Sequence, residues 1–135
     1  MSSTLGSNRI IVVVDDEPVV LNVVRLILQT AGYAVLATSD AQQALNLVEN
    51  RSHSIDLLLT DMNMPQINGL ELACRVSEIA PHLPVMFMTG CRAGSPGVEC
   101  LIREGPFSEC TVIRKPFTSP ELLGEVNSIL STALP

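Results

Sequence analysis

Short, uninterrupted apolar runs recur along this chain, and they constrain its fold more than any other feature. They occupy residues 10–14, 57–59, 85–88 and 112–113, with a weaker run at residues 33–36. Apolar side chains at successive positions are typical of strands that are buried on both faces. The sequence therefore predicts five buried strands.

The segments between these runs carry apolar residues at helical spacing. The clearest follows Pro18, which suits a first helical turn, and ends at Gly32. Asp15 and Asp16 precede it and are candidate caps. Three further helices are expected: one opened by Ser39 or Asp40, one between Asn68 and Pro81, and a terminal one after the capping box Thr118-x-x-Glu121.

Strands that alternate with helices require crossover connections and hence a parallel sheet with helices on both faces. We therefore expect an α/β three-layer sandwich built on a five-stranded parallel sheet. The stretch from residue 90 to 105 fits this pattern poorly, because it holds four of the eight glycines. A long mobile loop followed by one short helix is predicted there.

Composition excludes several classes of protein. A chain of 135 residues that is 47% hydrophobic suits one domain, placed at residues 9–131 between short tails at 1–8 and 132–135. A net charge of -6 with only eight Lys and Arg argues against a nucleic-acid surface. No apolar run spans a membrane and the N-terminus lacks a signal-peptide pattern, so a cytoplasmic location is predicted. The four cysteines form no C-x-x-C pair, which argues against a zinc ribbon.

Polar residues follow four of the predicted strands. Asp15 and Asp16 end the first, Asp61 the third, Thr89 the fourth and Lys115 the fifth. Each residue alone is explained by a cap, a turn or a solvated charge. Because ligands bind at the carboxyl ends of parallel strands, their joint placement indicates a site.

Three carboxylates at one point repel each other. Two unit charges about 4 Å apart cost about 4 kcal/mol at an effective dielectric constant near 20, so the cluster requires a cation or a proton. Lys115 supplies one positive charge, and Mg²⁺ suits the remaining oxygen ligands. A carboxylate beside Mg²⁺, a lysine and a hydroxyl is equipped to accept a phosphoryl group as an aspartyl phosphate.

Four motifs in this order resemble the receiver domain of bacterial two-component response regulators. They are Asp15-Asp16-Glu17-Pro18, Asp61-Met62-Asn63-Met64-Pro65 with Asn68-Gly69, Met88-Thr89-Gly90, and Lys115-Pro116-Phe117. The resemblance covers nearly the whole chain, and it implies a flavodoxin-like, doubly wound sheet of strand order 2-1-3-4-5.

The resemblance also implies roles for these residues. Asp61 is the expected phosphoacceptor, Thr89 the switch hydroxyl and Lys115 the partner of the phosphate. Mg²⁺ is expected on Asp16, Asp61 and the backbone carbonyl of Asn63, with Asp15 acting mainly through water. The implied donor is a phosphohistidine on a histidine kinase or histidine phosphotransfer protein, and the output runs through protein contacts with an unknown target. Catalysis is limited to the domain's own phosphorylation and dephosphorylation. The resemblance also allows a dimer that forms on phosphorylation.

The chain departs from the family pattern at two places. Val112 stands three residues before the lysine, where the family usually has Tyr or Phe, so the rotating partner of the switch hydroxyl is missing. The connection from Thr89 to Lys115 is longer and richer in glycine than usual. A conformational response through residues 90–105 is therefore expected in place of the aromatic switch.

Two other functions remain as alternatives. A pseudo-receiver is a binding module that is never phosphorylated, and the complete acidic set argues against it. A phosphatase of the haloacid dehalogenase type also uses an aspartyl nucleophile, but it requires D-x-D after its first strand, where this chain has Asp15-Asp16-Glu17.

Overall fold

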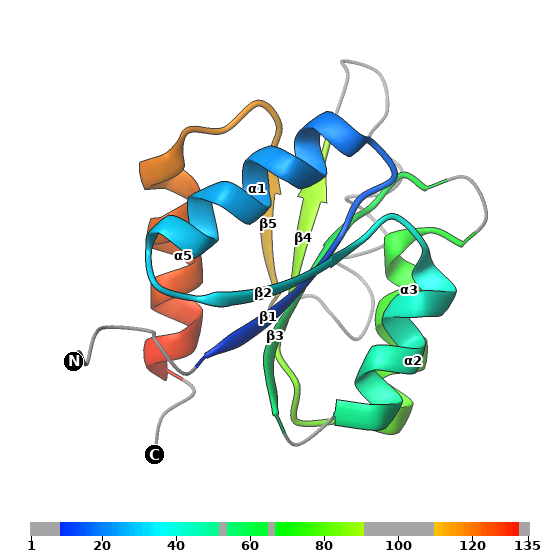
Figure 1. The fold of residues 1–135 in the computed structure, drawn as a ribbon. Coiled ribbons are helices and arrows are strands. Elements are labelled where there is room, and N and C mark those ends of the chain that lie inside the picture. The colour runs from blue at the N-terminus through cyan, green and yellow to red at the C-terminus, as the bar shows by residue number, and fades with distance from the viewer. Residues whose placement is uncertain (1–8, 52–53, 65–66, 91–109, 133–135) are drawn as a thin grey trace.

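A computed structural model describes residues 9–51, 54–64, 67–90 and 110–132. Five parallel strands form one sheet of order β2-β1-β3-β4-β5 (Figure 1). This architecture confirms the predicted α/β fold and its strand order. The strands are β1 (Ile10–Val14), β2 (Ala34–Thr38), β3 (Ile55–Asp61), β4 (Val85–Thr89) and β5 (Thr111–Arg114).

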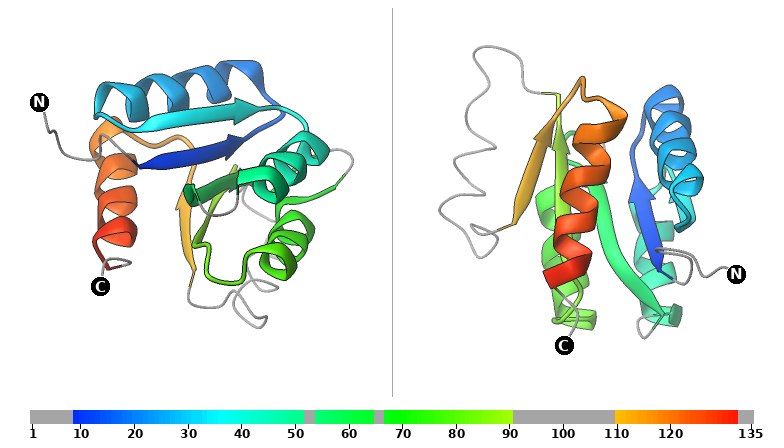
Figure 2. Two further views of the ribbon diagram at one scale, coloured as in Figure 1. Left: turned by 60° about the horizontal axis from the view of Figure 1, so that its bottom comes forward. Right: turned by 90° about the vertical axis from the view of Figure 1, so that its left-hand side faces the viewer.

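Helices cover both faces of this sheet, as Figure 2 shows. On one side lie α1 (Pro18–Thr30) and α5 (Ser119–Thr132), and on the other α2 (Ala41–Arg51) and α3 (Gly69–Ile79). Successive side chains of a strand point to opposite faces, so each apolar run supplies two cores. Val12 and Val14 pack on the α2–α3 side, whereas Ile11 and Val13 pack on the α1–α5 side. None of the described helices is long and apolar enough to cross a membrane.

The helix ends agree with the predicted signals at three places. Thr118 and Glu121 form the capping box, with each side chain accepting the other's backbone N–H at 3.2 and 2.8 Å. The side chain of Asn68 accepts the backbone N–H of Glu71 at 2.8 Å. Gly32 has a φ of 100°, which explains why α1 stops there.

The predicted aspartate cap of α1 is wrong. Glu17 occupies the N-cap position, and its side chain makes no capping hydrogen bond. Asp15 instead accepts the backbone N–H of Glu17 at 2.9 Å, outside the helix. The buried position of Asp15 turns its carboxylate toward the edge of the sheet, so it is not available to the first helical turn.

Several predicted segments lie outside the described residues. They are the tail at residues 1–8 and, apart from Gly90 and the residues next to β5, the connection expected to hold a loop and a short helix. The predicted response of residues 90–105 therefore stays a prediction.

Candidate functional site

The strand register brings the predicted polar residues to one edge of the sheet. Asp61 pairs with Met88, and Thr89 pairs with Arg114. The ladder continues one step further, because the backbone N–H of Lys115 donates to the carbonyl of Thr89 at 2.8 Å. On the other side, the N–H of Asp15 donates to the carbonyl of Thr38 at 3.3 Å. The carboxyl ends of β1, β3, β4 and β5 thus meet at a common level.

Three carboxylates converge at this edge. Asp15, Asp16 and Asp61 each offer one oxygen, and these oxygens lie within 4.8 Å of one another. Asp15 is 0% exposed and Asp61 is 3% exposed, whereas Asp16 is more open to solvent. The site therefore holds two buried acids and one accessible acid.

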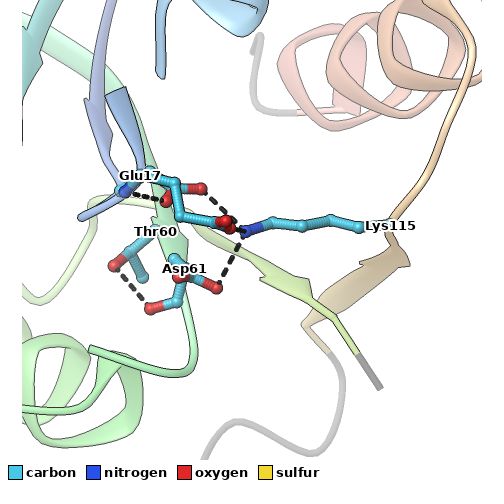
Figure 3. Close-up of polar contacts among 5 residues, drawn as sticks. Glu17, Thr60, Asp61 and Lys115 are labelled. Atoms are coloured by element: carbon cyan, nitrogen blue, oxygen red, sulfur yellow. Dashed lines mark hydrogen bonds and ion pairs between the residues drawn. The ribbon is translucent and has the colours of Figure 1, made fainter. Parts of the chain in front are cut away.

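Lys115 is the cation of this cluster (Figure 3). Its Nζ lies 2.8 Å from Asp15 Oδ2, 3.3 Å from Asp61 Oδ1 and 3.5 Å from Glu17 Oε1. The other oxygen of Asp15, Oδ1, accepts the N–H of Glu17. Both oxygens of Asp15 are thus engaged by the protein.

The electrostatics of the two buried groups follow from this arrangement. Burial raises the pKa of Asp61 to about 6, the charge of Asp15 adds to this, and Lys115 and the backbone N–H of Asn63 offset only part. Burial alone lowers the pKa of Lys115, but its hydrogen bond to Asp15 and the charges of Asp61 and Asp15 outweigh that effect and raise it. One lysine therefore leaves the buried carboxylates incompletely neutralised.

The oxygen that Lys115 approaches on Asp61 is poorly satisfied. Asp61 Oδ1 is buried and has no hydrogen-bond partner among the described residues, although the ammonium is at ion-pair distance. A buried acceptor in this state is costly unless something binds it. An all-oxygen ligand set, excess negative charge and an open acceptor fit a divalent cation such as Mg²⁺.

Comparison with known proteins places the chain in a family. Residues 11–127 match the response regulator receiver domain. The chain is 35% identical to the response regulator receiver protein CpdR of Brucella abortus over 106 residues, covering 78% of this chain and 83% of CpdR. The receiver domain structures from Clostridium thermocellum and Sinorhizobium medicae share 27% and 28% identity, cover 92% and 93% of this chain and 95% and 97% of theirs, and superpose with a TM-score of 0.79.

This chain is a response regulator receiver domain. It spans only part of some relatives, including 14% of a putative two-component response regulator of Arabidopsis thaliana, to which it is 38% identical over 88 residues. Receiver domains belong to two-component systems, act as signalling domains, bind Mg²⁺ at an acidic pocket and interact with histidine kinases or phosphotransfer proteins.

Two further predicted site residues of this receiver domain, Thr89 and Asn63, lie at the same edge, whereas Val112 lies within β5. Thr89 is buried at the end of β4, and Asn63 is exposed two residues after Asp61. Val112 is partly buried on β5 and packs against the core on the α2–α3 side. The structure thus brings Asp15, Asp16, Asp61 and Lys115 into one cluster, with Thr89 and Asn63 at its border.

Two features of the site are missing from the predictions made on sequence. The first is Glu17, whose carboxylate shares Lys115 with the two buried aspartates. The second is the tight fit of Gly69: a Cβ there would lie 2.3 Å from the carbonyl oxygen of Asp61. The glycine motif signalled the second, because close backbone approach is a common reason for glycine beside a site. Nothing local signalled the first.

Proposed function

We propose that this receiver domain accepts a phosphoryl group onto Asp61 from a phosphohistidine of a histidine kinase or phosphotransfer protein. The observation that carries the proposal is the state of Asp61: it is 3% exposed, its Oδ1 has no hydrogen bond among the described residues, and Lys115 Nζ stands 3.3 Å away. The carboxylate of Asp61 therefore has one oxygen without a hydrogen bond, and the ammonium of Lys115 lies next to it.

The chemistry assigned to these residues is a group transfer. A carboxylate oxygen of Asp61 forms a bond to phosphorus, the bond from phosphorus to the donor nitrogen breaks, and that nitrogen keeps the electron pair. Lys115 balances negative charge on the phosphoryl oxygens, where a fixed ammonium lowers the barrier. Thr89, at the end of the neighbouring strand, supplies the hydroxyl for the phosphorylated state.

The acidic residues have different proposed roles in binding a cation. Asp16, Asp61 and the carbonyl of Asn63 are the proposed Mg²⁺ ligands, and Asp15 acts mainly through water. The engagement of both Asp15 oxygens by Lys115 and the N–H of Glu17 supports this division, because Asp16 is freer to bind. When bound, Mg²⁺ supplies positive charge for the phosphoryl oxygens.

The domain at residues 9–131 works in the cytoplasm and signals by contact with a downstream protein, with no direct nucleic-acid contact. Its catalysis is confined to its own phosphorylation and dephosphorylation, and the proposed partners include a second phosphorylated copy of the domain.

A pseudo-receiver that never becomes phosphorylated is the alternative. The acidic cluster, the lysine and the threonine are all in place, which favours phosphorylation over this alternative. Membership of the receiver family replaces the haloacid dehalogenase alternative.

Intact-mass measurement after treatment with a small phosphodonor and Mg²⁺ tests the proposal. We expect one added phosphoryl group on the parent protein and none on Asp61→Asn. EDTA should abolish the addition to the parent. Labelling of Asp61→Asn, or labelling that ignores EDTA, contradicts the proposal, and an unlabelled parent that also fails to bind Mg²⁺ supports the pseudo-receiver.

A further inference from the structure

A pocket of about 430 Å³ opens beside the acidic cluster. One wall is α1, with Val20 and Val24, and the other is the segment after β5, with Phe117. Among the described residues that line it, only Glu17 and Lys115 are charged. The pocket is thus an apolar space with a carboxylate and an ammonium at one end.

Lys115 connects the charged end of the pocket to the proposed phosphoacceptor, because it lines the pocket and also contacts Asp61. Lys115 Nζ contacts both Glu17 Oε1, at 3.5 Å, and Asp61 Oδ1, at 3.3 Å. A phosphodonor whose phosphorus reaches Asp61 therefore places its leaving group near this pocket and Glu17.

Glu17 is free to interact with such a group. Lys115 already has a close, buried partner in Asp15 at 2.8 Å, whereas its contact with Glu17 is longer and the Glu17 side chain is 63% exposed. A long contact between an ammonium and a solvent-exposed carboxylate contributes little by itself. The Glu17 carboxylate can therefore turn to a donor N–H at little cost.

We propose that this pocket receives the leaving group of the phosphodonor, and that Glu17 selects nitrogen leaving groups over carboxylate ones. The inference rests on the proposed phosphorylation of Asp61 and adds a specificity-determining residue to it. The ligand class is a phosphorylated imidazole, whose flat ring suits the apolar walls.

The transfer balances without a separate base. In protonated N-phosphoimidazole, one ring nitrogen carries phosphorus and the other carries hydrogen. Asp61 forms the new oxygen–phosphorus bond, the nitrogen–phosphorus bond breaks, and neutral imidazole leaves with the electron pair on the first nitrogen. The second nitrogen keeps its proton and donates a hydrogen bond to Glu17, which is favoured because the ring is cationic at the start.

An acyl phosphate meets the opposite situation. Acetyl phosphate leaves as acetate, so negative charge grows on the leaving group as the bond to phosphorus breaks. Glu17 repels that charge and finds no N–H to accept. The same carboxylate therefore assists one donor class and opposes the other.

The test compares phosphorylation rates with N-phosphoimidazole and acetyl phosphate at saturating Mg²⁺. Glu17→Gln removes the charge and keeps the size of the side chain, and the backbone N–H that holds Asp15 is retained. Glu78→Gln removes a charge of the same sign on α3, away from the pocket. In Glu17→Gln we expect the rate ratio of N-phosphoimidazole to acetyl phosphate to fall about fivefold, and in Glu78→Gln to stay unchanged.

The outcomes separate this inference from the function on which it rests. If the parent is labelled and both donors change by the same factor in Glu17→Gln, the inference is overturned while the proposed function stands. If neither donor labels the parent, both fail. A fall in the ratio that shrinks at high salt supports the inference, since screening weakens an exposed charge. Thermal unfolding of each variant verifies that it is folded.

Discussion

The middle and the carboxyl end of β3 are equally buried. Neither residues 57–59 in the middle nor residues 60–61 at the end are open to solvent. In the middle, three leucines pack between helices on both faces, and removal of their surface from water stabilises the fold. At the end, Asp61 is buried beside Asp15, and burial raises its pKa to about 6. The same degree of burial therefore stabilises the leucines at the centre of the sheet but destabilises the charged form of Asp61 at its carboxyl end. A ligand that binds Asp61 can compensate for that charge.

The largest effect should come from the apolar centre. Phe87 is fully buried on β4, so Phe87→Ala should lower the free energy of unfolding by about 3–5 kcal/mol, because it removes buried surface and leaves a cavity. Urea denaturation in EDTA measures this. Leu26→Ala, on the exposed side of α1, should change the same quantity by less than about 0.5 kcal/mol. If Phe87→Ala and Leu26→Ala lowered the free energy of unfolding by similar amounts, burial at the centre of the sheet would not account for its stability.

Gly69 tests whether the site end tolerates added bulk. A Cβ at this position would meet the Asp61 carbonyl oxygen at 2.3 Å, so Gly69→Ala should cost about 1–3 kcal/mol and slow phosphorylation of Asp61. Gly124→Ala is the matched control, since nothing lies within 4 Å of a Cβ there and the residue is in α5. That variant should gain up to about 1 kcal/mol. Equal stabilities by chemical denaturation would rule out the close contact.

The two neighbouring aspartates sharpen the comparison within the site. Asp16→Ala should weaken Mg²⁺ binding about tenfold more than Asp15→Ala, because a direct ligand contributes more than a contact through water. Titration calorimetry with Mg²⁺ alone measures both affinities. Equal losses, or a larger loss for Asp15→Ala, would mean that the two roles are reversed.

Much of the fold could be predicted because its signals are local. The apolar run at residues 10–14 indicates a doubly buried strand wherever it occurs, and the capping box at Thr118 and Glu121 is complete within four residues. The position of Asp61 at a strand end needed only the order of the elements. Each of these features depends on neighbours in sequence or on the rules of parallel sheets.

The features that could not be predicted depend on contacts between segments that are distant in sequence. Glu17 meets Lys115 across 98 positions of the chain, and no periodicity indicates that distance. The cap of α1 was predicted wrongly for the same reason, because Lys115 draws the Asp15 carboxylate toward the site. The pocket between α1 and Phe117 likewise requires the packed structure.

We expect the buried charge of Asp61 to destabilise the metal-free protein. Its pKa is raised from 3.8 to about 6 in the folded state, so the folded protein holds this proton more tightly than the unfolded chain does. The contribution of this bound proton to the free energy of unfolding is fully present below about pH 4, and it is lost as the pH rises through 6. Asp61→Asn carries no such proton, and Lys115 keeps Asp15 as a partner in that variant.

The free energy of unfolding of the parent and Asp61→Asn, measured in EDTA from pH 4 to 8, tests this claim most directly. Relative to their difference at pH 4, Asp61→Asn should become more stable than the parent by up to about 3 kcal/mol above pH 6. Mg²⁺ at pH 8 should stabilise the parent and close much of the gap. A difference that does not change with pH, or a parent that gains on the variant above pH 6, would contradict the account.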